Sequence, residues 1–509
     1  MTITKVAIVG GGTAGWLAAN HLGLQLQETE ITVTVIESPD IPAIGVGEGT
    51  VPAIRQTLKK FGISETQFIR ECDVTFKQSI KFINWLDKHQ HGSGNFYHHL
   101  FENPQRFGEQ LASQWLDANH SQQRAVNPFA QCVSPQFSAV EQNKAPKTIT
   151  TPEYESVLAY AYHLNAAKFA RLLADNAKSK FAVRHQLENV IDAHLHTNGA
   201  IKSLVLDKSG EQAFDFYIDC SGFESVLHDK VLRAEFVDKS SQLLVNQAIV
   251  AQVPTEPDSE IPPYTKATAH KAGWIWDIAL THRRGVGLVY SDNYMPKSTA
   301  EDKMAQYLGD NADISTRQIP MKVGYRKQFW YHNCVALGLA QGFLEPIEAT
   351  SILLTDFASH YLASRFPKHG NQIPMLRDRF NKTMTYAWER VVEFAKMHYC
   401  LSDRNDSPFW IDNRLPETIP EPLRQRLEMW QHQPPITDDF FSRFEVFNLD
   451  NYQYVLYGMQ FQNQMQKRHL QASQNAFDRV SQVALQLSLQ LPEHRQLLQK
   501  INQFGLQKV

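Results

Sequence analysis

The chain has 509 residues, with 53 acidic and 50 basic side chains and a formal net charge of −3. Hydrophobic residues make up 43% and charged residues 20%, which excludes a disordered, collagen-like or disulfide-dense chain. The near-neutral net charge leaves no excess of basic residues to bind a nucleic acid backbone, and the sequence contains no polybasic segment that could anchor it to a membrane. Five scattered cysteines, without a signal peptide or a long apolar segment, indicate a soluble cytoplasmic protein.

The N-terminal segment predicts a βαβ unit. TKVAIV at 4–9 is typical of a buried strand, the next segment has helical spacing, and ITVTVIE at 31–37 predicts a second strand. A GxGxxG motif lies between the first strand and the helix, and an acidic residue ends the second strand. The glycines permit a sharp turn and close approach of backbone amides to a pyrophosphate, and the acid can accept a hydrogen bond from a ribose. The predicted dinucleotide contacts are Gly10, Gly12, Thr13, Ala14, Gly15 and Glu37.

Two more segments bring glycine or turn residues to the ends of strands. GVGEGTVP spans 45–52 and FYIDCSGF spans 216–223, and each by itself is compatible with a simple turn. The first motif does not distinguish FAD from NAD, but three such segments around one long ligand favour FAD. The predicted contacts in the second segment are Gly47, Glu48, Gly49 and Thr50.

The remaining chain predicts an α/β protein with a helical end. Residues 156–177 predict a helix, strand-like runs follow in the middle, and 298–366 alternates helix and strand. From about 375 onward, apolar residues recur at helical spacing. In GWIWDIA at 273–279, Trp274, Trp276 and Ile278 share one face of a strand, and this spacing alone favours an aromatic core stripe.

The segment LGLAQGFLEPIEATSILLTDF at 337–357 predicts a strand followed by a helix that begins at Pro346. Backbone amides near Thr350 and Ser351 would then lie at the positive helix end, where an anion can bind. Glu348 would occupy the first turn, where a carboxylate is more often a capping partner than a catalyst. In FKQSIKF, strand alternation places Lys77 on the polar face of the strand, and most lysines in such a pattern face solvent.

A group of histidines, at 89, 91, 98 and 99, lies in a stretch that predicts a polar loop. No acidic or cysteine partner stands at metal-ligand spacing, so we expect no metal site.

Together these segments resemble the flavin-dependent halogenases of the tryptophan halogenase family over nearly the whole chain. The family's motifs occur here in order: GxGxxG at 10–15, GVGEGTVP at 45–52, the lysine of FKQSIKF, HxF in YHHLF at 97–101, WxWxI at 274–278 and FLEPIEATS at 343–351. The resemblance implies an α/β fold, in which an FAD-binding Rossmann-like box with mixed β-sheets carries a mainly helical C-terminal substrate-side subdomain. It places the FAD-binding and catalytic module at 1–390 and the helical module that completes the substrate site at 391–509.

The resemblance implies halogenation of an electron-rich aromatic substrate such as an indole. A separate flavin reductase would supply FADH2, and dioxygen and chloride or bromide would yield hypohalous acid. Lys77 would direct this oxidant, as a haloamine or by hydrogen bonding. Glu348 would help to polarise the oxidant and would accept the proton lost from the ring. The backbone at Thr350 and Ser351 would bind the halide. The resemblance is compatible with a homodimer.

By the same resemblance, His99 and Phe101 match residues that sandwich the aromatic substrate, with Phe447 in place of a tryptophan. The WxWxI segment would lie near the flavin and discourage hydroxylation. Two positions depart from the family pattern, because Ala279 replaces a proline and Ala349 a serine. The residues that hold the amino and carboxylate groups of free tryptophan are not recognisable, so we expect another substrate.

Two other functions remain open at this point. One is a flavin-dependent monooxygenase that hydroxylates an aromatic ring, which the alanine at 279 favours. The other is a flavin-binding protein without turnover.

Overall fold

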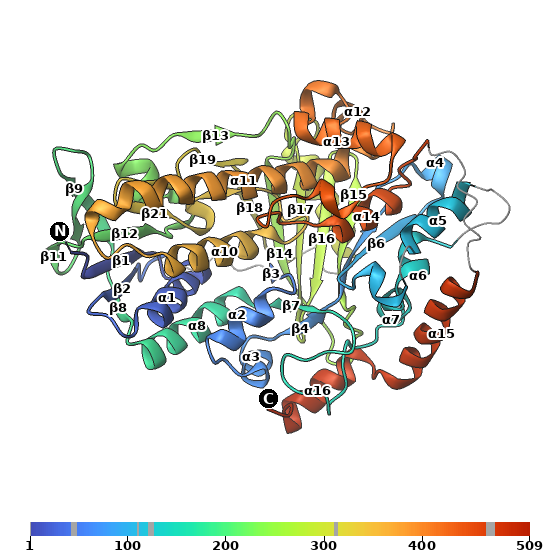
Figure 1. Cartoon of the computed structure of the whole chain (residues 1–509), viewed down its shortest axis with the longest axis horizontal. Helices are drawn as coiled ribbons and strands as arrows, with labels where there is room; N and C mark the ends of the chain where they lie inside the picture. The colour runs from blue at the N-terminus through green and yellow to red at the C-terminus, as the bar shows by residue number, and fades with distance from the viewer. Residues whose placement is uncertain are drawn as a thin grey trace.

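The computed structural model describes residues 2–41, 48–108, 111–120, 127–309, 314–464 and 474–508. Two large sheets organise this part of the chain, one at the N-terminal side and one toward the opposite end (Figure 1). The expected α/β class with mixed sheets is confirmed. All five cysteines are free thiols. Within the described ranges, no helix is both long and apolar enough to cross a membrane.

The six-stranded sheet is mainly parallel and contains the predicted βαβ unit. Its central strand pairs in parallel on both sides, and α1 (Thr13–Leu26) packs against α8 (Ala166–Phe181) and α10 (Thr350–Ser364). The strand order is β20 (Trp330–Tyr331), β21 (Cys334–Ala336), β12 (Phe216–Asp219), β1 (Lys5–Val9), β2 (Thr32–Glu37) and β8 (Arg184–Leu187). The local pattern sufficed here because buried parallel strands are continuously apolar.

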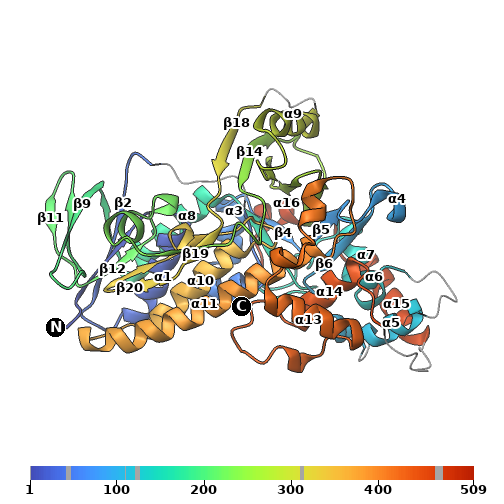
Figure 2. The same ribbon diagram turned by 90° about the horizontal axis from the view of Figure 1, so that it is seen from above.

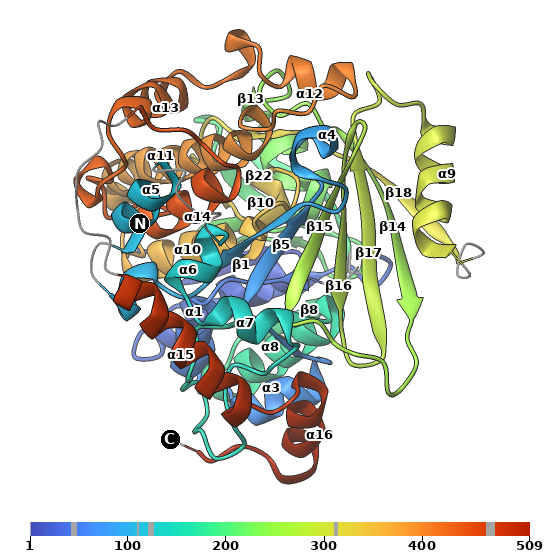
Figure 3. The ribbon, with the colours of Figure 1, turned by 90° about the vertical axis from the view of Figure 1, so that its right-hand side faces the viewer.

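The seven-stranded sheet is antiparallel except where β15 pairs with β5, and Figure 3 shows its long strands side by side. The predicted tryptophan strand is β16, in which all seven residues are buried. The strand order is β18 (Thr316–Pro320), β14 (Gln247–Pro254), β17 (Arg283–Tyr290), β16 (Gly273–Ala279), β15 (Tyr264–His270), β5 (Ser79–Ile83) and β6 (Phe96–Leu100).

Three small sheets complete the strands. The sheet of β9 to β11 lies at one end of the molecule (Figure 2). Their strand orders are β11 (Gly210–Gln212), β10 (Ile201–Leu206) and β9 (Val190–Leu195); β13 (Phe236–Asp238), β19 (Gly324–Arg326) and β22 (Gly342–Phe343); and β3 (Glu48–Gly49), β7 (Ala161–Leu164) and β4 (Thr75–Lys77).

The last of these sheets corrects two predictions. The helix expected over 156–177 is wrong in its first part, because β7 pairs with strands on both sides and α8 begins only at Ala166, after the cap residue Asn165. FKQSIKF is also not one strand. Its chain leaves the small sheet after Lys77 and enters the large sheet at Ser79, so alternation does not continue across Gln78.

The C-terminal part is mainly helical, as predicted. It contains α11 (Ile373–Cys400), α12 (Pro408–Asp412), α13 (Glu421–His432), α14 (Leu449–Gly458), α15 (Gln474–Gln490) and α16 (His494–Phe504). The predicted division at 390/391 falls inside α11, which continues without a break to Cys400. This division stays a prediction. The other helices are α2 (Ile54–Lys60), α3 (Glu65–Glu71), α4 (Lys88–His91), α5 (Leu111–His120), α6 (Phe129–Val133), α7 (Gln136–Glu141) and α9 (Lys297–Leu308).

Candidate active site

The GxGxxG loop joins β1 to α1 with the tight packing that its glycines predict. Gly10 has φ +115°, and a Cβ there would lie 2.2 Å from the carbonyl oxygen of Cys220. A Cβ on Gly15 would lie 1.9 Å from the carbonyl oxygen of Gly10. Gly12 differs, because it caps α1 without a side-chain hydrogen bond and a Cβ there would meet nothing within 4 Å. Open space therefore faces free amides at the start of this helix, where Thr13 and Ala14 follow, and this fits a pyrophosphate.

Glu37 ends β2 beside the same loop. Its half-buried carboxylate lies 2.8 Å from the Nε2 of His185, and a Cβ on Gly11 would lie 2.1 Å from its Cδ. The loop, the helix end and this acid together fit the predicted FAD site. In the second glycine segment, Gly47 lies outside the described residues, whereas Glu48 and Gly49 form β3. The Thr50 hydroxyl donates to the carbonyl of Tyr162 at 2.9 Å.

Lys77 is fully buried at the end of β4, although its strand pattern suggested an exposed lysine. Its Nζ donates to the carbonyl of Thr50 at 3.1 Å and lies 5.2 Å from the ring centroid of Phe101. Burial lowers the pKa of Lys77 to about 8, against the raising effect of the Glu348 carboxylate. An amine with this pKa exists in both protonation states near neutral pH.

Glu348 is buried in the loop before α10, not in the first helical turn that the sequence predicted. The helix begins at Thr350, because Ala349 adopts a left-handed conformation with φ +54° and ends the preceding turn. The carboxylate lies 2.9 Å from the His99 Nδ1 and 2.9 Å from the His398 Nε2. Burial alone would raise its pKa, but the two imidazoles lower the pKa of Glu348 to about 2. The group is therefore a carboxylate at neutral pH.

The tertiary structure brings the Lys77 and Glu348 segments together at Gly49. A Cβ on Gly49 would lie 3.3 Å from the Lys77 Nζ and 3.6 Å from the Cβ of Ala349, the residue after the carboxylate. The absence of a side chain at this position leaves room between the amine and the loop. A buried amine and a buried carboxylate from distant parts of the sequence thus face one region, as perturbed pairs do at catalytic sites.

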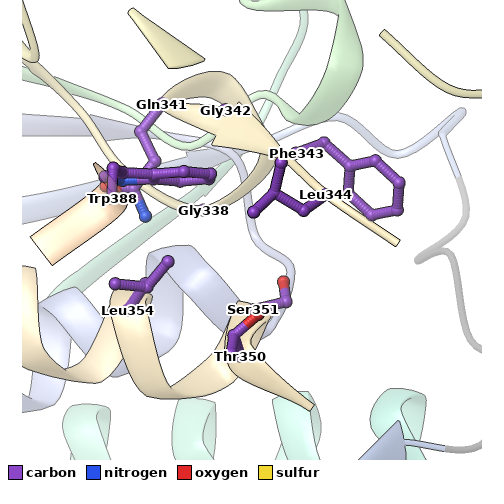
Figure 4. Close-up of a pocket in the computed structure, with 9 residues that line it drawn as sticks. All are labelled: Gly338, Gln341, Gly342, Phe343, Leu344, Thr350, Ser351, Leu354 and Trp388. Carbon is purple, nitrogen blue, oxygen red and sulfur yellow. The ribbon is translucent and has the colours of Figure 1, made fainter. Parts of the chain in front are cut away.

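A small pocket lies at the start of α10. Figure 4 shows Thr350 and Ser351 at this helix end below the loop from Gly338 to Leu344, with Trp388 alongside. A Cβ on Gly338 would lie 2.5 Å from the Cβ of Ala14, so the pocket adjoins the helix that follows the GxGxxG loop. Because no side chain caps α10, its first amides are available to an anion.

Of the predicted substrate-contact residues, only His99 contacts the Glu348 carboxylate directly. His99 lies at the end of β6, and both of its ring nitrogens are in hydrogen bonds, to Glu348 and to the Nδ2 of Asn451 at 3.0 Å. Its edges are therefore occupied, whereas a ring face remains a stacking surface. Phe101 lies beside Lys77. Phe447 is buried and stacks on Phe394 of α11, with ring centroids 3.8 Å apart.

The tryptophan strand is packed in the interior beside α11. The rings of Trp274 and Trp276 are 6.1 Å apart, and Ile278 is also buried. A Cβ on Gly287 would lie 2.0 Å from the Trp276 ring, so this glycine lets the indole lie across the neighbouring strand. The core stripe expected from spacing is present.

Sequence reasoning missed His398, Tyr97 and Asn451. His398 lies in the middle of α11 and contacts Glu348, yet nothing distinguishes it from a core histidine in a helical pattern. Asn451 gave a weak signal, because Asn448 and Asn451 have the spacing of a helix capping box. Among the described residues, no group of three or more potential metal ligands occurs.

Comparisons with known proteins cover almost the entire chain. The family model described as tryptophan halogenase matches residues 5–475. The tryptophan 6-halogenase SttH of Streptomyces toxytricini is 33% identical over 472 residues, which are 89% of each chain. The crystal structure of a tryptophan halogenase from Shewanella frigidimarina has a TM-score of 0.94 and 37% identity, with 100% of this chain and 99% of that chain covered. BrvH, a flavin-dependent halogenase from Brevundimonas sp. BAL3, has a TM-score of 0.86 and 29% identity, with 98% and 99% covered.

Proposed function

Since the chain belongs to the tryptophan halogenase family and is a flavin-dependent halogenase, we propose that Lys77 and Glu348 carry its reaction. The substrate is an electron-rich aromatic compound such as an indole, which is chlorinated or brominated. The observation that supports these roles is that a buried amine and a buried carboxylate from distant segments lie close enough to interact, with Gly49 next to the amine and to the residue after Glu348.

The flavin site supports the first half of the reaction. The GxGxxG loop and the open helix end at Gly12 would hold the diphosphate of FAD, and Glu37 would hold its ribose. Bound FADH2 supplies, with dioxygen, the oxidising equivalent that converts chloride or bromide into hypohalous acid. A separate flavin reductase delivers the reduced cofactor. The amides at Thr350 and Ser351 bind the halide at the positive end of α10.

Lys77 positions the oxidant at the substrate. As an ammonium group, it donates a hydrogen bond to the oxygen of hypohalous acid while the carbonyl of Thr50 holds its Nζ. This makes the halogen more electrophilic and directs it toward one ring carbon. The surrounding burial excludes water and prevents the oxidant from reacting elsewhere.

Glu348 completes the substitution. After the halogen bonds to the ring, the carboxylate accepts the proton from the same ring carbon. Its two imidazole neighbours keep it ionised and oriented. The ring faces of His99, Phe101 and Phe447 supply stacking surfaces for the substrate.

The test combines purified protein, enzymatically reduced FAD, oxygen and either chloride or bromide with indole, substituted indoles, phenols and free tryptophan. Mass spectrometry should detect a halogenated product, and Lys77→Ala should reduce its formation by more than a hundredfold. Lys81→Ala is the matched control. The Lys81 Nζ pairs with the Glu141 carboxylate at 2.6 Å, away from the proposed site. Normal halogenation by Lys77→Ala would refute the assigned role. A gain of oxygen without halogen would establish hydroxylation instead.

A further inference from the structure

Glu348 is the centre of a chain of five side chains that the proposed reaction does not by itself explain. On one side, His99 Nδ1 lies 2.9 Å from the carboxylate, and Asn451 Nδ2 lies 3.0 Å from His99 Nε2. On the other side, His398 Nε2 lies 2.9 Å from the carboxylate, and the Tyr97 hydroxyl lies 2.8 Å from His398 Nδ1. Each imidazole therefore joins Glu348 to one outer polar group.

The orientation of Asn451 determines the tautomer of His99. The Asn451 Oδ1 accepts a hydrogen bond from the backbone N–H of Asn448 at 3.0 Å, in the capping box of α14. Its Nδ2 must then be the atom that faces His99, and this atom can only donate. The His99 Nε2 is therefore an acceptor, and the ring proton lies on Nδ1, directed at Glu348.

The tautomer of His398 follows from the carboxylate and the tyrosine. The His398 Nε2 lies 2.9 Å from the Glu348 carboxylate without the alignment of a hydrogen bond. A bare lone pair at this distance would repel the carboxylate, so we place the proton on Nε2, in close electrostatic contact with Glu348. Burial lowers the pKa of His398, which keeps the ring neutral and leaves Nδ1 as an acceptor. The Tyr97 hydroxyl donates to it, because burial raises the pKa of Tyr97 well above its usual value.

We propose that Tyr97 and Asn451 are positioning residues, which fix the tautomers of His398 and His99. His99 then donates a hydrogen bond to Glu348, and His398 presents an N–H rather than a lone pair to the same carboxylate. This inference rests on the proposed function of Glu348. The His99 hydrogen bond and the His398 contact together hold the carboxylate in one orientation. The titratable groups that face Glu348 are Tyr97 and His99 of β6, His398 of α11 and Lys77 of β4.

Two variants change an outer group without removing an element of the fold. Tyr97→Phe removes only the hydroxyl and preserves the ring stacked on Phe82, with centroids 4.8 Å apart. Asn451→Asp keeps an oxygen that accepts from the backbone of Asn448 but turns the group facing His99 from a donor into an acceptor. Tyr454→Phe is the control, because the Tyr454 hydroxyl donates to the carbonyl of Glu102 and not to His99 or His398.

The expected effects differ between the variants. In Asn451→Asp, an acceptor replaces the donor at His99 Nε2, so a neutral His99 carries its proton on Nε2 and turns a lone pair toward Glu348. The kcat should therefore fall about tenfold, and the aromatic KM should stay within twofold. In Tyr97→Phe, His398 can exchange its tautomer, and we expect kcat to fall about fivefold at all pH values with the same KM. Tyr454→Phe should match the parent enzyme.

Nitrogen-15 NMR of histidine-labelled resting enzyme measures the tautomers directly, with His99→Gln and His398→Gln used for assignment. The parent should show Nδ1–H for His99 and Nε2–H for His398, and the two variants should change these signals one at a time. Because this readout needs no turnover, it remains valid if the proposed reaction is wrong. Opposite tautomers in the parent, or variants with parental spectra and parental kcat, would overturn the proposal.

Discussion

Replacement of Lys77 by methionine should stabilise the protein while it abolishes halogenation. Lys77 is fully buried, and its pKa lies at about 8 where a lysine in water has 10.5. This shift corresponds to about 3 kcal/mol by which burial disfavours the ammonium form. Loss of the hydrogen bond to the Thr50 carbonyl offsets about 1 kcal/mol. The net gain in unfolding free energy is about 2 kcal/mol, which raises the Tm by about 2 °C for a chain of this length.

The pH dependence gives the prediction its sign. Below pH 8 the lysine is charged in both the folded and unfolded states, so the folded state carries the full unfavourable energy. Between pH 8 and 10.5 the folded amine is already neutral, and this energy disappears as the unfolded lysine also loses its proton. The stability gain of Lys77→Met over the parent should therefore be largest at pH 7 and fall as pH rises. Near pH 10.5 it should reverse to a loss of about 1 kcal/mol, because only the missing hydrogen bond to Thr50 remains.

Thermal unfolding followed by calorimetry or circular dichroism, at several pH values, measures this difference. Lys81→Met is the control with the opposite sign. It removes the Lys81 partner of Glu141 at 2.6 Å, leaves only His98 at 3.0 Å, and should lower the Tm slightly. A Lys77→Met variant that is less stable than the parent at pH 7, or equally shifted at all pH values, would refute the reasoning about a desolvated ammonium group.

Three further predictions concern the site. Glu348→Gln should lower kcat about a hundredfold with little change in the aromatic KM, measured at saturating halide; a loss below threefold would exclude it as the proton acceptor. In the parent enzyme, kcat should fall as pH rises through about 8, because Lys77 then loses the proton that it donates to the oxidant; a rise would assign the neutral amine. Gly10→Ala should lower the free energy of unfolding by about 2 kcal/mol. Gly12→Ala should keep the parental Tm but weaken FAD binding in a fluorescence titration. Equal losses of Tm in the two variants would contradict the open space at Gly12.

Local sequence patterns succeeded where neighbouring residues alone decide the structure. The βαβ unit with Gly10 and Gly15, the tryptophan strand and the helical C-terminal part all followed from periodicity and steric requirements. The start of α10 was predicted too early, because the left-handed Ala349 that separates Pro346 from the helix leaves no signature in residue types. The strand β7 was read as helix, because its pairing partners β3 and β4 lie about a hundred residues earlier in the chain.

The amino-acid sequence by itself determined the α/β class, the nucleotide-binding loop and, through the order of its motifs, the candidate residues Lys77 and Glu348. Only the tertiary structure decided their chemistry. A pKa depends on burial and on charges close in space, so the strand pattern that suggested an exposed lysine could not reveal an amine enclosed between Thr50, Gly49 and Phe101. The two imidazoles that keep Glu348 ionised come from β6 and α11, some three hundred residues apart in the chain, and folding alone places them on one carboxylate.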